Sequence, residues 1–288
     1  MAAEHCGHAM TPGPGREGPP ASVAPDHEPA AASWLLEEVR RLEQAAADAR
    51  PLPRLTRRRD GVSLAQAYSL QQHWADHRLR AGDTAVGYKV GLTSPAMQRQ
   101  FGIDEPDSGI LLASAQLPSD GFVPCAGLIA PRVEGEFAFR LGAGLTGVGI
   151  GENDVRAAID GACLALEVID SRYDLEGITL VDSVADNAAC ARFVLGEFAA
   201  VPDWDLRHEV LTVQAGGTDV AAGDGRQVLG DPIRSILWLV RSLAGRGTGL
   251  RAGDIVLTGA VHASLPLHPG LAVQASSPSL PPVRVQAV

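Results

Sequence analysis

The sequence has little that would place this chain in a membrane, outside the cell or on a nucleic acid. Its longest apolar runs are far shorter than the roughly 20 residues that a helix needs to cross a bilayer. The first thirty residues lack the basic and then apolar order of a secretory signal. A formal net charge of -10 disfavours binding to phosphate backbones and anionic membranes. We therefore expect a cytoplasmic protein that binds neither nucleic acid nor membrane.

Several sequence signatures of other protein classes are missing as well. The four cysteines form no CxxC pair and have no regular spacing, so we expect free thiols rather than disulfides or a thiolate zinc site: Cys6, Cys125, Cys163 and Cys190. No glycine-rich phosphate loop of either common type is present, which argues against nucleotide binding. The short basic run 57–59 is interpreted as a solvated surface patch. A small molecule is therefore the expected partner.

What the chain does contain is enough apolar sequence for a sizeable core, with 45% hydrophobic residues over 288. Residues 1–31 are rich in Pro, Gly, Ala and His without apolar periodicity, which predicts a disordered extension. Residues 32–82 have helical periodicity. One helix is expected to end before Pro51, and a second to begin at the S-x-x-Q capping box of Ser63 and to end at Gly82. Nothing in this N-terminal helical unit looks catalytic.

From residue 83 to residue 288 the sequence changes to short β-like runs punctuated by Gly and Pro. Two helices are expected to interrupt them, at about 153–164 with Asn153 as the cap, and at about 231–244 with Asp231 as the cap. Many short strands with few helices predict an α+β fold whose catalytic domain has a mostly β, rolled or barrel-like core.

Two glutamates share one face of an expected strand in PRVEGEFAFRL. Alternation places Glu134 and Glu136 roughly 6.5–7 Å apart at the backbone, so both carboxylates could turn toward one ion. Gly135 between them leaves room for close backbone approach. A solvated polar face is the alternative. Glu167 favours the ion, because an ionised carboxylate in the apolar stretch ACLALEVIDSRY is costly to bury without a counter-charge. Carboxylates without His or Cys suit Mg²⁺ or Mn²⁺ rather than zinc.

Lys89 is a second unexpected charge, since VGYKVGLT reads as a strand of apolar residues and glycines. It could snorkel to the surface. If it faces the metal, burial and the cation would lower its pKa and make it a proton donor or acceptor. Asp107 and Asp186 lie in turn-like contexts, where Asp is commonly structural. The scattered histidines are predicted to be surface or structural residues: His208, His262 and His268.

Seven segments, read together, resemble the family of 2-oxopent-4-enoate hydratases and 4-oxalocrotonate decarboxylases, within the fumarylacetoacetate hydrolase superfamily. They occur in the family's order: GYKVGLTSPAMQ, IDEPDSGIL, PRVEGEFAF, LALEVIDSRY, VADNAACARFVLG, VLGDPIRSILWLV and GDIVLTGA. The resemblance implies a mixed β-roll, Mg²⁺ or Mn²⁺ held by Glu134, Glu136 and Glu167, an acid–base Lys89, and a homo-oligomer. It also implies substrate contacts within these motifs: Leu92, Asp186, Ala189, Thr258 and Gly259.

The reaction implied by the resemblance is metal-dependent hydration of a 2-hydroxy-2,4-dienoate in the degradation of an aromatic or steroid ring. The product would be a 4-hydroxy-2-oxo acid, formed through the 2-oxo-enoate tautomer. Hydratases of this family have a P-D-F-G segment, whereas decarboxylases tend to have an apolar residue in place of the Asp. Asp107 therefore favours hydration and is a candidate to orient or deprotonate the water.

Other activities remain open at this point. They are decarboxylation of an oxalocrotonate-like acid, another lyase or dehydratase step on a 2-oxo acid in a specialised pathway, hydrolysis of a C–C bond, and a non-catalytic partner subunit. Two residues depart from the family pattern: Ala189 stands where a Ser is usual, and Ser108 replaces an aromatic residue. Because both are expected near the pocket, we expect a substrate larger than, or shaped differently from, the simple pentadienoate.

Overall fold

The computed structural model describes residues 28–200 and 205–288. The expected disordered extension lies outside these residues as far as residue 27, and so does Cys6. Residues 28–31, which composition assigned to the extension, instead begin helix α1 (Glu28–Asp48). A proline is tolerated in the first turn of a helix and alanine is the best helix former, so the segment EPAAAS continues the helical pattern.

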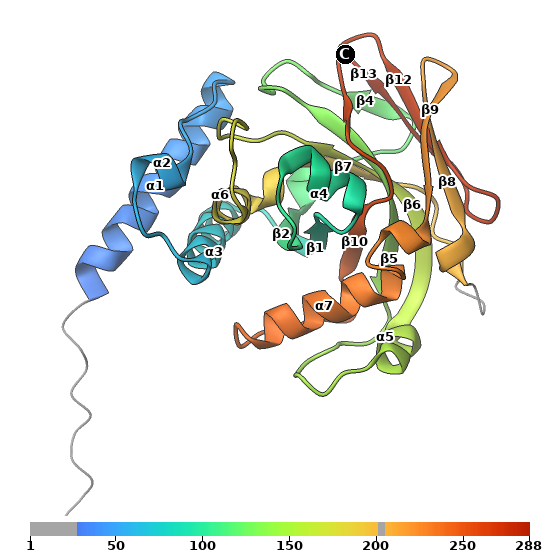
Figure 1. Ribbon diagram of the computed structural model, residues 1–288, viewed down its shortest axis with the longest axis horizontal. Helices are drawn as coiled ribbons and strands as arrows, with labels where there is room; N and C mark the ends of the chain where they lie inside the picture. The colour runs from blue at the N-terminus through green and yellow to red at the C-terminus, as the bar shows by residue number, and fades with distance from the viewer. Residues whose placement is uncertain (1–27, 201–204) are drawn as a thin grey trace, which may run out of the picture.

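The N-terminal helices α1, α2 (Leu55–Arg58) and α3 (Leu64–Arg80) lie at one side of the molecule (Figure 1). The predicted capping box is confirmed: Ser63 Oγ accepts from Gln66 N at 3.2 Å, and Gln66 Oε1 accepts from Ser63 N at 2.9 Å. The three helices and the body of the protein share one apolar cluster, which includes Leu35, Leu42, Leu70, Trp74, Ile110, Tyr173 and Val184. The helical unit is therefore packed onto the rest of the chain.

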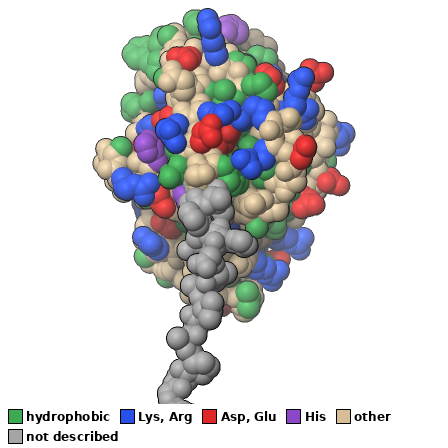
Figure 2. Space-filling model, turned by 90° about the vertical axis from the view of Figure 1, so that its left-hand side faces the viewer, with side chains coloured by type: hydrophobic (Ala, Val, Ile, Leu, Met, Phe, Trp, Pro, Cys, Tyr) green, Lys and Arg blue, Asp and Glu red, His purple; other side chains and the backbone are tan. Residues whose placement is uncertain are grey.

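The basic run 57–59 is only partly the solvated patch that we expected. Arg57 and Arg59 are exposed, but Arg58 forms an ion pair with the buried Glu38, whose carboxylate also accepts from the Tyr173 hydroxyl at 2.7 Å. On the side of the molecule that carries these helices, acidic and basic side chains are interspersed (Figure 2).

The main sheet has eight strands and curls into an open roll (Figure 1). Its order is β2-β1-β10-β5-β6-β7-β3, and β11 also pairs with β5. The strands are β1 (Ala85–Gly91), β2 (Asp107–Leu112), β3 (Gln116–Leu117), β5 (Arg132–Leu141), β6 (Ile159–Ile169), β7 (Cys190–Leu195), β10 (Ile255–Ala260) and β11 (Leu265–Pro266). The long strands β5 and β6 form its centre.

A second sheet of five strands, in the order β4-β13-β12-β8-β9, covers one face of β5 and β6. Its strands are β4 (Gly121–Val123), β8 (Val210–Ala215), β9 (Thr218–Asp224), β12 (Ala272–Ser276) and β13 (Val283–Ala287). Alternation sends Phe137, Phe139 and Leu164 into this interface, where they pack in one cluster with Leu211 and Val273. The opposite face of β5 and β6 is left for the glutamates. The predicted α+β fold with a rolled, mostly β core is confirmed.

Shorter elements complete the chain. The helices are α4 (Pro95–Phe101), α5 (Glu152–Ala158), α6 (Leu180–Ala185) and α7 (Pro232–Ala244), and the 3-10 turns span Ala113–Ala115, Asn187–Ala189, Leu206–His208 and Gly225–Gln227. Helix α7 begins as predicted, with Asp231 Oδ1 accepting from Ile233 N at 2.9 Å. No helix within residues 28–200 and 205–288 has the length and apolar character to cross a bilayer. The three described cysteines are free, as expected.

The predicted helix at 153–164 was wrong in its second half. Helix α5 ends at Ala158 and β6 begins at Ile159, because Ala162 and its neighbours pair with β5 across a continuous antiparallel register. Gly151, rather than Asn153, caps α5. Helices α4 and α6 were also missed. Each is only seven or six residues long, too short for apolar periodicity to reveal.

Gly87 provides a test of the close approach between β1 and β10. Its φ is 150°, and a Cβ at this position would lie 1.9 Å from Ile255 O. Gly87→Ala should therefore separate the two strands and lower the free energy of unfolding by about 3 kcal/mol. Gly149→Ala is the matched control, since nothing lies within 4 Å of its Cβ position. Urea denaturation followed by circular dichroism measures the difference, and equal stabilities would contradict the tight approach.

Candidate active site

Three glutamates meet on the face of the main sheet that the second sheet leaves free. Glu134 lies directly opposite Glu167 in the register of β5 and β6, and Glu136 is the next residue on the same face. All three are buried. One carboxylate oxygen from each lies within 4.8 Å of the others. The solvated polar face considered from the sequence is therefore wrong.

Most of the carboxylate oxygens have no hydrogen-bond partner among the described residues. Glu134 Oε1, Glu136 Oε1 and both oxygens of Glu167 are buried without one, although Glu167 Oε2 faces the Lys89 ammonium at 3.4 Å. Glu136 Oε2 accepts from Gly259 N at 2.7 Å. Unpaired buried carboxylates are costly, and oxygen-only ligation is what hard divalent cations prefer. The residues therefore fit a site for such a cation.

The pKa values of these carboxyl groups reflect the cost of burying their negative charges. Burial, reinforced by the charge of Glu167, raises the pKa of Glu134 to about 8. Burial and the charges of Glu167 and Glu134 raise the pKa of Glu136 well above its ordinary value. Without a cation the cluster consequently retains protons at neutral pH.

Lys89 is the only lysine in the sequence, and it points into the cluster from β1. Its Nζ lies 3.4 Å from Glu167 Oε2 and donates to Ala188 O at 3.0 Å. Snorkelling to the surface is therefore excluded. Burial favours the neutral amine, but the charges of Glu167, Asp107 and the other glutamates outweigh it and raise the Lys89 pKa. A lowered Lys89 pKa was expected from the sequence on the condition that a cation lies nearby. With the carboxylates alone, the Lys89 pKa is raised instead.

Asp107, at the start of β2, lies beside Lys89. Its Oδ2 accepts from Ser183 Oγ at 2.5 Å, while its buried Oδ1 has no partner among the described residues. Gly91 is its partner in β1, and a Cβ on Gly91 would lie 2.2 Å from Asp107 Oδ1 and 3.0 Å from Lys89 Nζ. The absence of a side chain at Gly91 therefore lets the carboxylate and the amine lie close to each other.

A cleft opens onto these groups. Lys89, Asp107 and Glu134 belong to its polar part. Most of the remaining wall is apolar and comes from the end of β1, from α4 and from the segments that follow β6: Leu92, Met97, Phe101, Ile103, Ile169, Leu175, Ile178 and Ala189. The cleft can therefore hold a small, partly apolar molecule against the carboxylates.

Of the five residues expected to contact the substrate, two line the cleft and three do not. Leu92 and Ala189 line the cleft, both with positive φ values of 57°. Thr258 Oγ1 donates to Phe137 O at 2.9 Å, and Gly259 contributes only its N–H to Glu136. Asp186 accepts from Ser171 Oγ at 2.9 Å and from Arg172 Nε at 2.5 Å. These last three are not among the residues that line the cleft.

Ser108 does not alter the pocket as the sequence suggested. It follows Asp107 in β2, so alternation points it to the opposite face of the strand. There its Oγ lies 3.5 Å from the Tyr68 hydroxyl and 3.4 Å from Arg246 Nη2. Of the two departures from the family pattern, only Ala189 lies in the cleft.

Three polar residues of the cleft were not among the predicted site residues: Arg132, Ser171 and Ser183. Arg132 had a usable signal, because alternation puts it on the face of Glu134. Its Nε and Nη2 donate to Ser264 Oγ and Ser264 O at 2.7 and 2.5 Å. Ser183 lies in the unpredicted helix α6, and nothing in the sequence connects it to Asp107.

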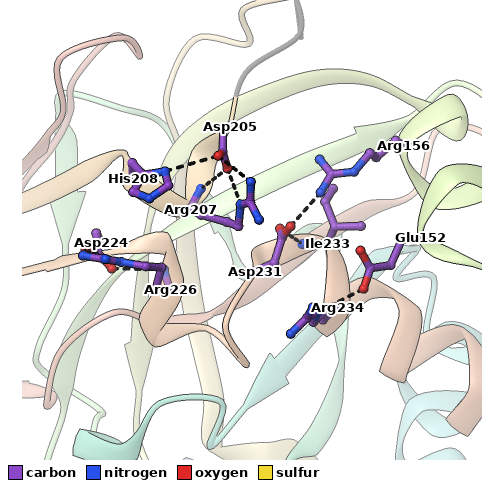
Figure 3. Close-up of polar contacts among 10 residues, drawn as sticks. All are labelled: Glu152, Arg156, Asp205, Arg207, His208, Asp224, Arg226, Asp231, Ile233 and Arg234. Atoms are coloured by element: carbon purple, nitrogen blue, oxygen red, sulfur yellow. Dashed lines mark hydrogen bonds and ion pairs between the residues drawn. The ribbon is translucent and has the colours of Figure 1, made fainter.

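The three histidines considered from the sequence, His208, His262 and His268, do not line the cleft. His262 is buried on the other side of β5, where its Nε2 accepts from Gly135 N at 3.1 Å. His208 belongs to an exposed ion-pair group, with Nδ1 3.2 Å from Asp205 Oδ2 (Figure 3). In the same region Arg156 pairs with Asp231 at 2.6 Å and so connects α5 to the start of α7 (Figure 3).

The curled sheet is of the fumarylacetoacetate hydrolase type, and the model of the fumarylacetoacetate hydrolase C-terminal family matches residues 110–288. A 2-keto-4-pentenoate hydratase of Burkholderia vietnamiensis is 40% identical over 82% of this chain and 88% of its own length. A 4-oxalocrotonate decarboxylase of Pseudomonas sp. strain CF600 is 36% identical over 80% and 87%.

Among solved structures, the 4-oxalocrotonate decarboxylase from Pseudomonas putida G7, complexed with magnesium and adipate, matches with a TM-score of 0.85 and 32% identity. The match covers 89% of this chain and 98% of that chain. The chain thus belongs to the family of 2-keto-4-pentenoate hydratases and 4-oxalocrotonate decarboxylases.

The region matched by the broader family divides the site in two. Glu134, Glu136 and Glu167 lie inside it, whereas Lys89 and Asp107 precede residue 110. The three glutamates and the two candidate acid–base groups therefore come from different segments of the chain.

The raised pKa of Glu134 predicts how pH affects stability. Because its folded pKa of about 8 exceeds the ordinary value of 4.5, its stabilising contribution is complete below the unfolded pKa and is lost as pH rises through about 8. In EDTA, the Tm should therefore fall across that range. Excess Mg²⁺ should raise the Tm more above pH 8 than below it, because the cation competes with protons for the carboxylates. Differential scanning fluorimetry measures both effects. Glu134→Gln should weaken the pH step, and a pH-independent Tm in the unmodified protein would contradict the assignment.

Proposed function

We propose that this protein is a divalent-metal-dependent hydratase of 2-hydroxy-2,4-dienoates. The observation that carries the proposal is Asp107, which presents one unpartnered carboxylate oxygen beside Lys89 in a cleft above the glutamates. A hydration site needs a group that accepts a proton from water close to a group that supplies one to carbon. The hydratase relatives, 34–41% identical over most of the chain, support the same activity.

The cofactor that we propose is Mg²⁺ or Mn²⁺, held by Glu134, Glu136 and Glu167. Their unpartnered oxygens and the absence of His or Cys from the cluster support a hard cation. When bound, the cation would stabilise negative charge on the C2 oxygen of the substrate as the enol becomes a ketone. We also expect a cytoplasmic protein, from the features of the sequence, and a homo-oligomer, as the resemblance implies.

Lys89 would move the proton in the first step. Its ammonium is fixed by Ala188 O and Glu167, so a proton is held at a defined atom. Transfer of this proton to C5 of the dienol, with loss of the 2-hydroxyl proton, gives the conjugated 2-oxo-3-enoate. The amine can then recover a proton from the hydroxyl group and return to its starting state.

Asp107 would act in the second step. Its free Oδ1 can accept a proton from a water molecule as the water oxygen adds to the electrophilic C4. Lys89, protonated again after the first step, gives a proton to C3 and so completes the 4-hydroxy-2-oxo acid, after which Asp107 loses its proton to solvent and Lys89 gains one from solvent. Ala189 has no hydroxyl group that could bind this water, so the position of the water would depend more strongly on Asp107. The apolar wall formed by Leu92, Met97 and Ile169 suits the carbon chain of the substrate.

Decarboxylation of an oxalocrotonate-like acid is the second candidate, and Arg132 is the observation that favours it. Two of its guanidinium nitrogens are held by Ser264, while Nη1 has no hydrogen bond among the described residues. A fixed guanidinium edge in the cleft can bind a carboxylate, which would suit a substrate with a second acid group.

Glu136→Gln tests the metal assignment. The variant keeps an oxygen that can accept from Gly259 N but loses a charged ligand, so we expect Mg²⁺ affinity and metal-dependent activity to fall at least about 100-fold with the fold intact. Isothermal titration calorimetry and circular dichroism measure the two properties. Glu197→Gln, at an exposed position, is the control. Unchanged activity in the Glu136 variant would exclude this metal site.

Product analysis tests the reaction. With Mg²⁺ and enzymatically generated 2-hydroxypenta-2,4-dienoate, we expect loss of the diene absorbance and a product heavier by one water in mass spectrometry. Asp107→Asn should slow this reaction by about 10²–10⁴-fold, the usual contribution of a general base, whereas the exposed Asp104→Asn should not. Turnover of oxalocrotonate with release of CO₂, and no hydration of any dienoate, would favour the second candidate instead.

A further inference from the structure

We propose that Ser183 is a positioning residue that aims Asp107 at the water, and that the N-terminal helical unit holds Ser183 in place. The inference rests on the proposed hydratase function and assigns a role to residues that do not belong to the acid–base pair or to the metal ligands.

The contact between Ser183 and Asp107 fixes one carboxylate oxygen and leaves the other available. Rotation of an aspartate carboxylate about its last bond is only weakly restricted. The 2.5 Å hydrogen bond from Ser183 Oγ to Oδ2 removes that freedom, so the unpartnered Oδ1 keeps one direction. Both residues line the cleft. A base that is held in one orientation avoids the loss of rate that accompanies small misplacements.

Ser183 is in turn fixed through its neighbour in α6. Asp182 is fully buried, and its carboxylate accepts from Thr56 N at 2.9 Å and from Thr56 Oγ1 at 2.8 Å. It also accepts from Thr179 N and Oγ1 at 3.0 and 2.7 Å, which caps α6. Residue 56 lies in α2, so the N-terminal unit is bound directly to the helix that carries Ser183.

Gln71 of α3 makes a second connection. Its buried amide donates to Ser108 O at 2.7 Å and to Val184 O at 3.0 Å. Ser108 follows Asp107, and Val184 follows Ser183. One side chain therefore joins the backbone beside the base to the backbone beside its hydrogen-bond donor, and sets the separation of β2 and α6.

These contacts give the N-terminal unit a function even though it contributes no side chain to the cleft. Its helices precede residue 110, where the match to the broader family begins. The unit is packed against β2 and α6 through one apolar cluster, and the polar contacts of Thr56 and Gln71 lie within that interface. The geometry therefore supports a scaffold that specifies the position of Asp107.

The test compares two rates in the Mg²⁺-loaded enzyme. Water addition to 2-hydroxypenta-2,4-dienoate requires Asp107, whereas deuterium exchange at C3 of 2-oxopentanoate, a compound without a double bond to hydrate, requires only the metal site and Lys89. We expect Ser183→Ala to lower kcat for hydration about 10- to 100-fold while KM and the exchange rate change less than about twofold. Ser183→Thr, which restores the hydroxyl, should recover most of the hydration rate.

Ser235→Ala is the matched control. It likewise removes a hydrogen-bonded hydroxyl, which donates to Thr258 O at 2.8 Å, but Ser235 is buried outside the cleft. Its ratio of hydration to exchange should equal that of the unmodified enzyme. A parallel loss of both rates in Ser183→Ala, a change in KM alone, or no recovery with threonine would overturn the positioning role. If the unmodified enzyme exchanges deuterium but hydrates no dienoate, the proposed function fails, and this inference fails with it.

Discussion

The burial of three carboxylates beside one another is the constraint on which the rest of the structure depends. Each would be costly alone, and together they also repel. The strands β5 and β6 hold them by an extended register, with Glu134 opposite Glu167, and an apolar core behind them that includes Phe137 and Phe139. One buried ammonium, that of Lys89, cannot offset three negative charges. The sheet is therefore a rigid platform that becomes electrostatically balanced only with additional positive charge, either protons or a cation.

The glutamates and the candidate acid–base residues occupy different strands of this platform. The glutamates lie in the region that the broader family shares, whereas Lys89 and Asp107 lie on β1 and β2 before it. Parallel pairing of β1 with β10 brings the amine to the carboxylates, and β2 adds Asp107 at the edge of the sheet. If Lys89 and Asp107 have the proposed roles, a change in the preceding segment would alter the acid–base groups without disturbing the carboxylates. The family includes proteins named as hydratases and as decarboxylases.

The predictable and unpredictable parts of the site have different physical origins. Alternation along a strand placed Glu134 and Glu136 on one face, and apolar surroundings identified Glu167 as a buried charge. The register that sets Glu134 opposite Glu167 is a long-range property that local sequence does not encode. Ser108 was expected in the pocket because it is next to Asp107 in the sequence, but alternation along β2 directs its side chain to the opposite face. Ser183 was missed because a six-residue helix has too little periodicity to be recognised.

The same electrostatics bear on why the buried basic residue beside the glutamates is a lysine and not an arginine. The chain has 24 basic residues of the Lys and Arg types, and Lys89 is the only lysine among them. An arginine at that position could balance charge and would remain protonated under all relevant conditions. A lysine can lose its proton when a cation takes over the neutralisation of the carboxylates, because the charges that raise its pKa are then compensated. The cluster and the lysine are thus coupled: in the metal-free protein Lys89 and bound protons together offset the glutamates, and a cation bound to the carboxylates would compensate the charges that hold the proton on Lys89.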